Sequence, residues 1–215
     1  MSGFAKRRDS LTEKRKVAGS IPALATMNIR RAFAPVAVTL AVAAMALSAP
    51  IASAQPVHTL TDLVDAAVRR LQIAEPVAAN KFHTGDPIKD PAREQQVLDS
   101  VAAQARDLQV DPQYVTTAFR DQIDATVAIE YQRLAQWTFD PAVAPTDSPD
   151  LARSRDIIDA LNREMVLLMA EEWPKLHSPQ CVGELDAAKS TVATERGLDP
   201  LYRQAVDVAT RNYCR

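Results

Sequence analysis

Glu130 is the residue whose surroundings point most directly to chemistry. It lies in a helical stripe of apolar side chains that recur at steps of three and four residues, namely Ile123, Val127, Leu134 and Trp137. A carboxylate in such a stripe is costly unless it is paired with a cation or protonated. Thr126, one turn earlier, adds a hydroxyl group on the same side.

Four basic residues lie in or beside similar apolar stripes: Arg70, Lys81, Arg93 and Arg155. A single arginine or lysine in such a place usually forms an ion pair or extends its charged end into solvent. Together with Glu130, however, these residues come from four predicted helices of an otherwise acidic protein. The set favours a pocket inside a helix bundle for a small anion with more than one carboxylate.

Charge is distributed unevenly along the 215 residues, which hold 25 Lys+Arg and 27 Asp+Glu. Residues 1–54 contain 8 basic and 2 acidic residues, so residues 55–215 carry a formal charge of −8. Such a surface argues against a nucleic-acid partner or an anionic membrane. The composition is otherwise that of a folded protein with one sizeable core.

Several common catalytic motifs are absent from the sequence. Only Gly85, Gly183 and Gly197 follow position 54, so the chain has no glycine-rich phosphate loop and no dinucleotide fingerprint. HExxH, CxxC and GxSxG are also missing. We therefore expect a reaction that uses no cofactor and no metal.

The first 54 residues have the order of a secretory signal peptide. Arg30 and Arg31 precede an apolar run over 33–47, and Ala-Ser-Ala at 52–54 forms a cleavage site. A membrane anchor is the alternative, but prolines interrupt the run and it is shorter than the ~20 residues of a spanning helix. We expect export, cleavage after Ala54 and no membrane attachment afterwards, with Met27 as an alternative start of translation.

Residues 55–215 then form one domain, and their apolar periodicity is helical throughout. The first helix is expected from about residue 58 to 82, with a bend near Pro76. Asp90-Pro91 and Asp111-Pro112 are start signals for a helix over 91–108 and a long central helix over 112–137.

The prolines in 140–149 predict a crossover loop that ends the long helix. Three further helices are expected over 151–173, 179–195 and 199–213. No segment shows the alternation of a strand. The predicted fold is all-α, a single-domain bundle of about six helices.

Cys181 and Cys214 are the only cysteines. In an exported protein they meet an oxidising compartment, so we expect one disulfide that holds the carboxyl-terminal helices together. A zinc site is the alternative, but His58, His83 and His177 are scattered along the sequence.

Several segments resemble the exported all-helical chorismate mutases, particularly the mycobacterial type: Leu63–Leu71, Pro76–Lys81, Asp121–Thr126, Ala128–Tyr131 and Asp150–Arg155. The similarity extends over essentially all of 55–215. It implies a Claisen rearrangement of chorismate to prephenate, with no cofactor, in a homodimer whose pockets each lie inside one chain.

The resemblance also implies roles for the charged residues. Arg70, Arg93 and Arg155 match contacts to the substrate carboxylates. Lys81 and Glu130 match the residues that hydrogen-bond the ether oxygen whose bond breaks. Lys81, Glu130 and Arg155 are therefore the expected catalytic residues.

The remaining substrate contacts are less clearly defined. Thr126 matches a hydroxyl residue near a carboxylate, and Asp90 matches the region of the ring hydroxyl, although helix packing and helix capping explain these two equally well. Some relatives carry Gln where this chain has Val97. Gln96 and Glu94 are therefore the two candidates for the contact to the ring hydroxyl of the substrate.

Two other functions fit the same sequence. A related lyase on this helical scaffold releases pyruvate from isochorismate. An exported helical protein that only binds a ligand is a further alternative, although the complete set of interior charges argues against it.

Overall fold

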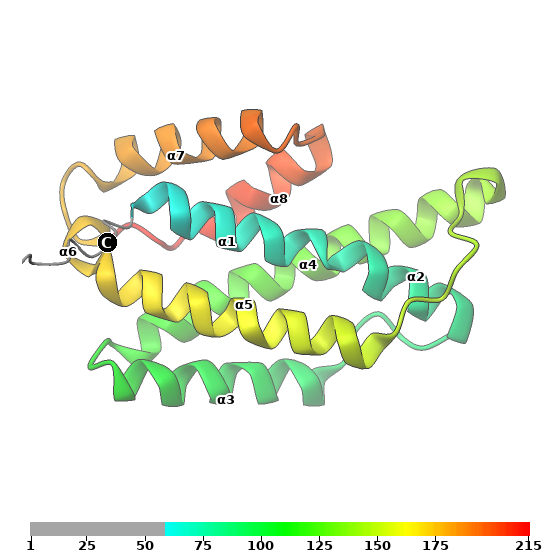
Figure 1. Ribbon diagram of the computed structural model, residues 1–215, viewed down its shortest axis with the longest axis horizontal. Coiled ribbons are helices and arrows are strands. Elements are labelled where there is room, and N and C mark those ends of the chain that lie inside the picture. Colours follow the sequence, from blue (N-terminus) through cyan, green and yellow to red (C-terminus); the bar gives the residue numbers. More distant parts are fainter. Residues whose placement is uncertain (1–58) are drawn as a thin grey trace, which may run out of the picture. The chain divides into compact units, whose positions relative to one another are not determined.

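Eight α-helices and one short 3-10 helix make up residues 59–215, which are the residues that the computed structural model describes (Figure 1). The helices are α1 (Leu60–Gln72), α2 (Ala74–Thr84), α3 (Pro91–Asp107), α4 (Pro112–Phe139), α5 (Leu151–Glu171), α6 (Trp173–Leu176), α7 (Cys181–Glu195) and α8 (Pro200–Thr210). The 3-10 helix covers Pro141–Val143. No strand occurs within 59–215, so the all-α prediction is confirmed.

The helix count exceeds the predicted six because one predicted helix is divided in two and a separate single-turn helix follows α5. The predicted first helix is divided into α1 and α2, and the division lies at Ile73 instead of Pro76. A proline is tolerated in the first turn of a helix but not in its interior, so the chain begins a new helix just before Pro76. In addition, α6 forms a separate single turn after α5.

Aspartate caps fix where the helices around the later site begin. The side chain of Asp90 accepts a hydrogen bond from the Arg93 backbone N–H, and Asp111 accepts one from Gln113. Each cap is followed by proline at the first helical position, as predicted. Asp150 caps α5 in the same way through the N–H of Ala152, at 2.8 Å. Each cap contributes about 1 kcal/mol.

The core lies where α1 meets α4, α5, α7 and α8. Figure 1 shows α2 continuing beyond the end of α1, with α4 running past both. Leu63, Val64 and Val68 of α1 are fully buried. Truncation of a buried leucine such as Leu63 to alanine costs about 2–5 kcal/mol.

The carboxyl-terminal segment, residues 211–215, is held against this core by a disulfide and by hydrogen bonds. A disulfide joins Cys181 to Cys214, as predicted. The Tyr114 hydroxyl donates to the carbonyl oxygen of Tyr213 at 2.6 Å, and both tyrosines are buried. The Arg215 backbone N–H donates to the carbonyl oxygen of Leu176.

The predicted signal peptide and its cleavage site at 52–54 lie outside the described residues. Among residues 59–215, no helix is both long enough and apolar enough to cross a membrane.

Candidate active site

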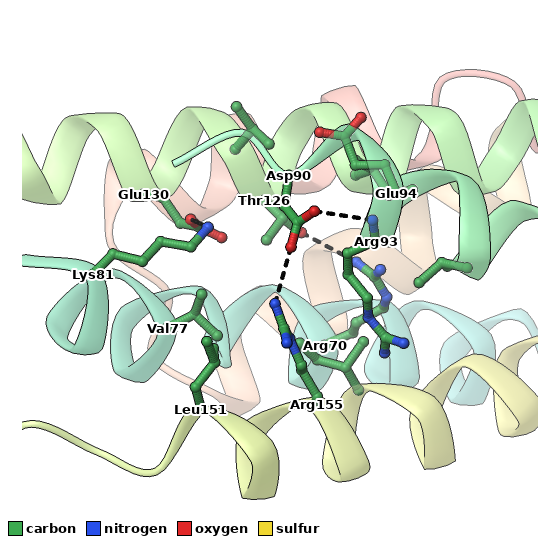
Figure 2. Close-up of a pocket in the computed structure, with 14 residues that line it drawn as sticks. Arg70, Val77, Lys81, Asp90, Arg93, Glu94, Thr126, Glu130, Leu151 and Arg155 are labelled. Atoms are coloured by element: carbon green, nitrogen blue, oxygen red, sulfur yellow. Dashed lines mark hydrogen bonds and ion pairs between the residues drawn. The ribbon is translucent and has the colours of Figure 1, made fainter. Parts of the chain in front are cut away.

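A cavity between α1, α2, α3, α4 and α5 gathers charged side chains from all five helices (Figure 2). It contains about 560 Å³ of space, part of it open to solvent. Its lining consists of Arg70, Val77, Lys81, Asp90, Arg93, Glu94, Val97, Ile123, Thr126, Val127, Glu130, Leu151, Arg155 and Ile158.

Lys81 and Glu130 form a buried ion pair on one side of the cavity (Figure 2). The Lys81 Nζ lies 2.8 Å from Glu130 Oε2, and the two side chains are 8% and 6% exposed. Lys81 also donates to the backbone carbonyl oxygen of Ile88. Burial raises the pKa of Glu130 above its ordinary value, although the hydrogen bond and charge of Lys81 act in the opposite direction. The pair therefore places an ammonium group beside a carboxyl group that stays protonated to a higher pH than an ordinary glutamate.

Arg70 is buried on the other side of the cavity (Figure 2). Its Nε donates to Asn162 Oδ1 at 2.7 Å, and an Nη donates to Thr126 Oγ1 at 3.1 Å. Burial lowers the pKa of Arg70 to about 10, so the guanidinium remains charged at neutral pH. A fixed cation with little water around it interacts strongly with an anionic ligand.

Arg93 and Arg155 are held by carboxylates on neighbouring helices. Arg155 lies 3.0 Å from Asp90, whose other carboxylate oxygen caps α3. An Nη of Arg93 lies 2.5 Å from Asp159 Oδ1, and its other Nη donates to Gln96 at 2.8 Å. The Arg155 side chain is 40% exposed, so this cation is at the solvent side of the cavity.

Glu94 and Gln96 point in different directions from α3. Glu94 lines the cavity and forms an ion pair with Arg120 of α4 at 2.7 Å. Gln96 lies outside the cavity, where it lines a second hollow between α3 and α5. Val97 faces the cavity with an apolar side chain. Only Glu94 of the two candidates for the hydroxyl contact is thus next to the cavity.

Seven of the eight substrate-binding residues expected from the sequence line this cavity, and Gln96 is the exception. Asp159 and Asn162 were not among the site residues expected from the sequence, although both follow Arg155 at helical spacing, four and seven residues later. This spacing alone was the available signal. Within residues 59–215, no group of three or more His, Cys, Asp or Glu side chains is arranged as a metal site.

The arrangement is suited to a small anion with more than one negative charge. Three guanidinium groups and one ammonium group border the cavity, against the side chains of Asp90, Glu94 and Glu130. The lining therefore has an excess of positive charge, which is larger when Glu130 keeps its proton. Apolar contacts from Val77, Ile123 and Leu151 complete the lining and would contact a hydrocarbon ring.

The family model described as "Chorismate mutase type II" matches residues 61–131. The chain is also similar to two curated proteins named secreted chorismate mutase. It is 52% identical to that of Mycolicibacterium smegmatis over 178 residues, which cover 82% of this chain and 98% of the relative. It is 44% identical to that of Mycobacterium tuberculosis over 169 residues, covering 79% and 85% of the two chains.

The fold is similar to that of a solved structure, the chorismate mutase from Burkholderia thailandensis. The TM-score is 0.69 with 33% sequence identity, and the match covers 72% of this chain and 98% of the other.

Proposed function

The chain belongs to the chorismate mutase family, and from this premise we propose that its cavity rearranges chorismate to prephenate without a cofactor. The observation that carries the proposal is the buried Lys81–Glu130 pair, which shares one cavity with Arg70, Arg93 and Arg155. A unimolecular rearrangement needs no nucleophile. It needs a substrate fixed in its reactive conformation and stabilisation of the charge that develops as a bond lengthens.

The three arginines supply the first requirement. Chorismate carries two carboxylates, and a guanidinium can bind a carboxylate through two parallel hydrogen bonds. In our proposal Arg70, Arg93 and Arg155 hold these two groups, and the Thr126 hydroxyl lies beside one of them. Fixing both ends of a flexible molecule removes conformational freedom before the reaction begins.

Lys81 and Glu130 supply the second requirement at the ether oxygen. Negative charge grows on this oxygen as its carbon–oxygen bond lengthens, and both the ammonium group and a protonated Glu130 can donate a hydrogen bond to it. Donors fixed before the reaction contribute about 3 kcal/mol each. Burial of Glu130, which raises its pKa, favours the protonated form that this role requires.

In our proposal the amino-terminal turn of α3 binds the ring hydroxyl of the substrate. Asp90 and Glu94 are both at the cavity and are held by Arg155 and Arg120, respectively. We favour these two over Gln96, whose amide is hydrogen-bonded to Arg93 outside the cavity.

We further propose that the protein is exported and works as a homodimer. Export is supported by the Arg30-Arg31, apolar run and Ala-Ser-Ala order, by the disulfide, and by the two relatives that are named as secreted. Mass spectrometry of culture fluid should find a chain that begins at Gln55, and an unprocessed form alone would contradict export. Light scattering on this chain should give twice the mass of residues 55–215.

The test of the activity uses purified residues 55–215 with chorismate and, separately, with isochorismate. We expect the absorbance of chorismate to decay and prephenate to appear, with no release of pyruvate from isochorismate. Pyruvate as the main product would identify a lyase. Saturable binding of chorismate without turnover would identify a binding protein.

A further inference from the structure

Two polar residues of α5 lie behind the cavity and connect two of its arginines. Asn162 Oδ1 accepts a hydrogen bond from Arg70 Nε at 2.7 Å. Its Nδ2 is 3.4 Å from Asp159 Oδ1, and the same oxygen is 2.5 Å from an Nη of Arg93. A continuous chain of hydrogen bonds therefore runs from Arg70 through Asn162 and Asp159 to Arg93.

Neither residue borders the cavity itself. Asp159 and Asn162 line the hollow between α3 and α5, on the other side of Arg93. A ligand in the cavity would therefore contact the arginines and not these two side chains. Any influence on such a ligand has to act through Arg70 and Arg93.

The electrostatics of the two arginines show why such a connection is needed. Arg70 is 4% exposed, and the positive charge of Arg93 disfavours its charged form, whereas the negative charge of Asp159 favours it. Two cations held close together repel one another and would move apart or turn towards solvent. Asp159 compensates this repulsion, and Asn162, itself only 5% exposed, fixes the plane of the Arg70 guanidinium.

The types of the two residues suit this task. A carboxylate in both positions would place two negative charges side by side, and two amides would leave the arginines without a compensating anion. One carboxylate and one amide keep a net positive charge facing the cavity. Their place on α5, at four and seven residues after Arg155, also couples all three arginines to a single helix.

We propose that Asp159 and Asn162 are positioning residues, which hold Arg93 and Arg70 in the orientation that binds the two carboxylates of the substrate. This inference rests on the proposed mutase function. It assigns the orientation of the carboxylate-binding arginines to a pair of side chains that the substrate does not touch.

A double-mutant cycle tests the role of Asn162. Asn162→Ala should lower kcat/KM about tenfold to a hundredfold, because a buried charged donor loses its acceptor. In an Arg70→Lys background the same substitution should cost less than about twofold, because the guanidinium that it orients is already gone. Asp156→Asn, on the exposed side of the same helix, is the matched control and should leave kcat/KM unchanged.

An exchange of the two side chains provides a second test with no change in volume. Asn162→Asp alone should lower kcat/KM at least about tenfold through repulsion between the two carboxylates. Combined with Asp159→Asn, it should recover to within about threefold of the wild type, because the pair again offers one carboxylate and one amide. A residue with a purely structural role would give losses that add instead of recovery.

The outcomes separate this inference from the function on which it rests. If the wild-type protein does not turn over chorismate, the proposed function is wrong and the positioning role falls with it. If the wild type is active but Asn162→Ala costs the same in both backgrounds, or the exchange does not restore activity, only the positioning role is wrong.

Discussion

The cavity and the carboxyl-terminal segment both bury charged groups, but they use them differently. At the cavity, the Lys81 and Glu130 side chains are at most 8% exposed and border space that a ligand can occupy. Next to the carboxyl-terminal segment, the Asp121 side chain is 3% exposed, and its oxygens accept hydrogen bonds from Arg211 and Asn212 at 2.5–2.8 Å. The charged groups at the cavity border a space that a ligand can enter. The carboxylate of Asp121 is already hydrogen-bonded to other side chains of the protein.

This difference separates activity from stability in a way that experiments can address. Changes at the cavity that leave the Lys81–Glu130 pair intact should alter turnover with small effects on unfolding, because the charged groups there are costly to bury and are held for a ligand. Changes near the disulfide should alter unfolding and leave turnover intact. A variant that breaks this separation would show that the two regions are coupled.

The largest effect is expected for Glu130→Ala, which removes a buried donor from the proposed reacting oxygen. We expect kcat to fall by a factor of about 10²–10³, as found for loss of one preorganised donor. Glu130→Gln keeps a donor of similar size and should retain appreciable activity. Steady-state kinetics on chorismate measures both, and a Gln variant as inactive as the Ala variant would contradict the proposed role.

The pH dependence sharpens the same prediction. The pKa of Glu130 is raised, so the protonated, active form persists above the ordinary pKa of a glutamate and is lost as pH rises through the raised value. Turnover of the wild type should therefore decline on the alkaline side. Glu130→Gln cannot lose a proton there, so its profile should be flat in this range. An unchanged alkaline decline in the Gln variant would assign the titration to another group.

Next in size is loss of the Cys181–Cys214 disulfide, at the opposite side of the comparison. The two cysteines are 33 residues apart, and closing a loop of this length stabilises the folded state by about 3–4 kcal/mol in the chain-entropy model. The Cys181→Ser, Cys214→Ser double variant should melt at a lower temperature. Its kcat/KM, measured well below that temperature, should stay within about twofold of the wild type, and a larger loss would mean that the segment supports the cavity directly.

A somewhat smaller effect is expected for Arg155→Lys. Lysine keeps the charge but lacks the planar pair of donors, so we expect a loss in kcat/KM of about tenfold to a hundredfold, with little change in melting temperature. Arg153→Lys is the control, since Arg153 is exposed on the same helix and does not line the cavity. Equal activity of the two variants would remove Arg155 from the site.

The smallest effect is expected for Tyr114→Phe near the carboxyl terminus. The substitution leaves the buried carbonyl oxygen of Tyr213 without its donor and should cost about 1–2 kcal/mol in thermal or denaturant unfolding. Tyr131→Phe, on the exposed side of the same helix, should be neutral. Turnover should not change in either variant, and a drop for Tyr114→Phe would again indicate coupling between the two regions.

The sequence alone was sufficient for features that depend on neighbouring residues. Helical periodicity, the Asp-Pro start signals and the proline-rich crossover are local, and α3, α4 and α5 begin where these signals predict. The sequence also showed that charged residues such as Glu130 lie within apolar stripes, because the period of 3.6 residues determines on which face of a helix a residue lies. The break between α1 and α2 was predicted near Pro76 but lies at Ile73, because the effect of a proline extends to the turn before it.

The tertiary structure decided which polar atoms meet. Glu94 and Gln96 are two residues apart, and only the packing of α3 against α4 and α5 determines that Glu94 is at the cavity and Gln96 behind Arg93. Likewise, the link from Arg70 to Asn162 joins residues 92 positions apart in the sequence. Helical period gives the direction of a side chain relative to its own axis, whereas its partners depend on how the axes pack, which no local pattern contains.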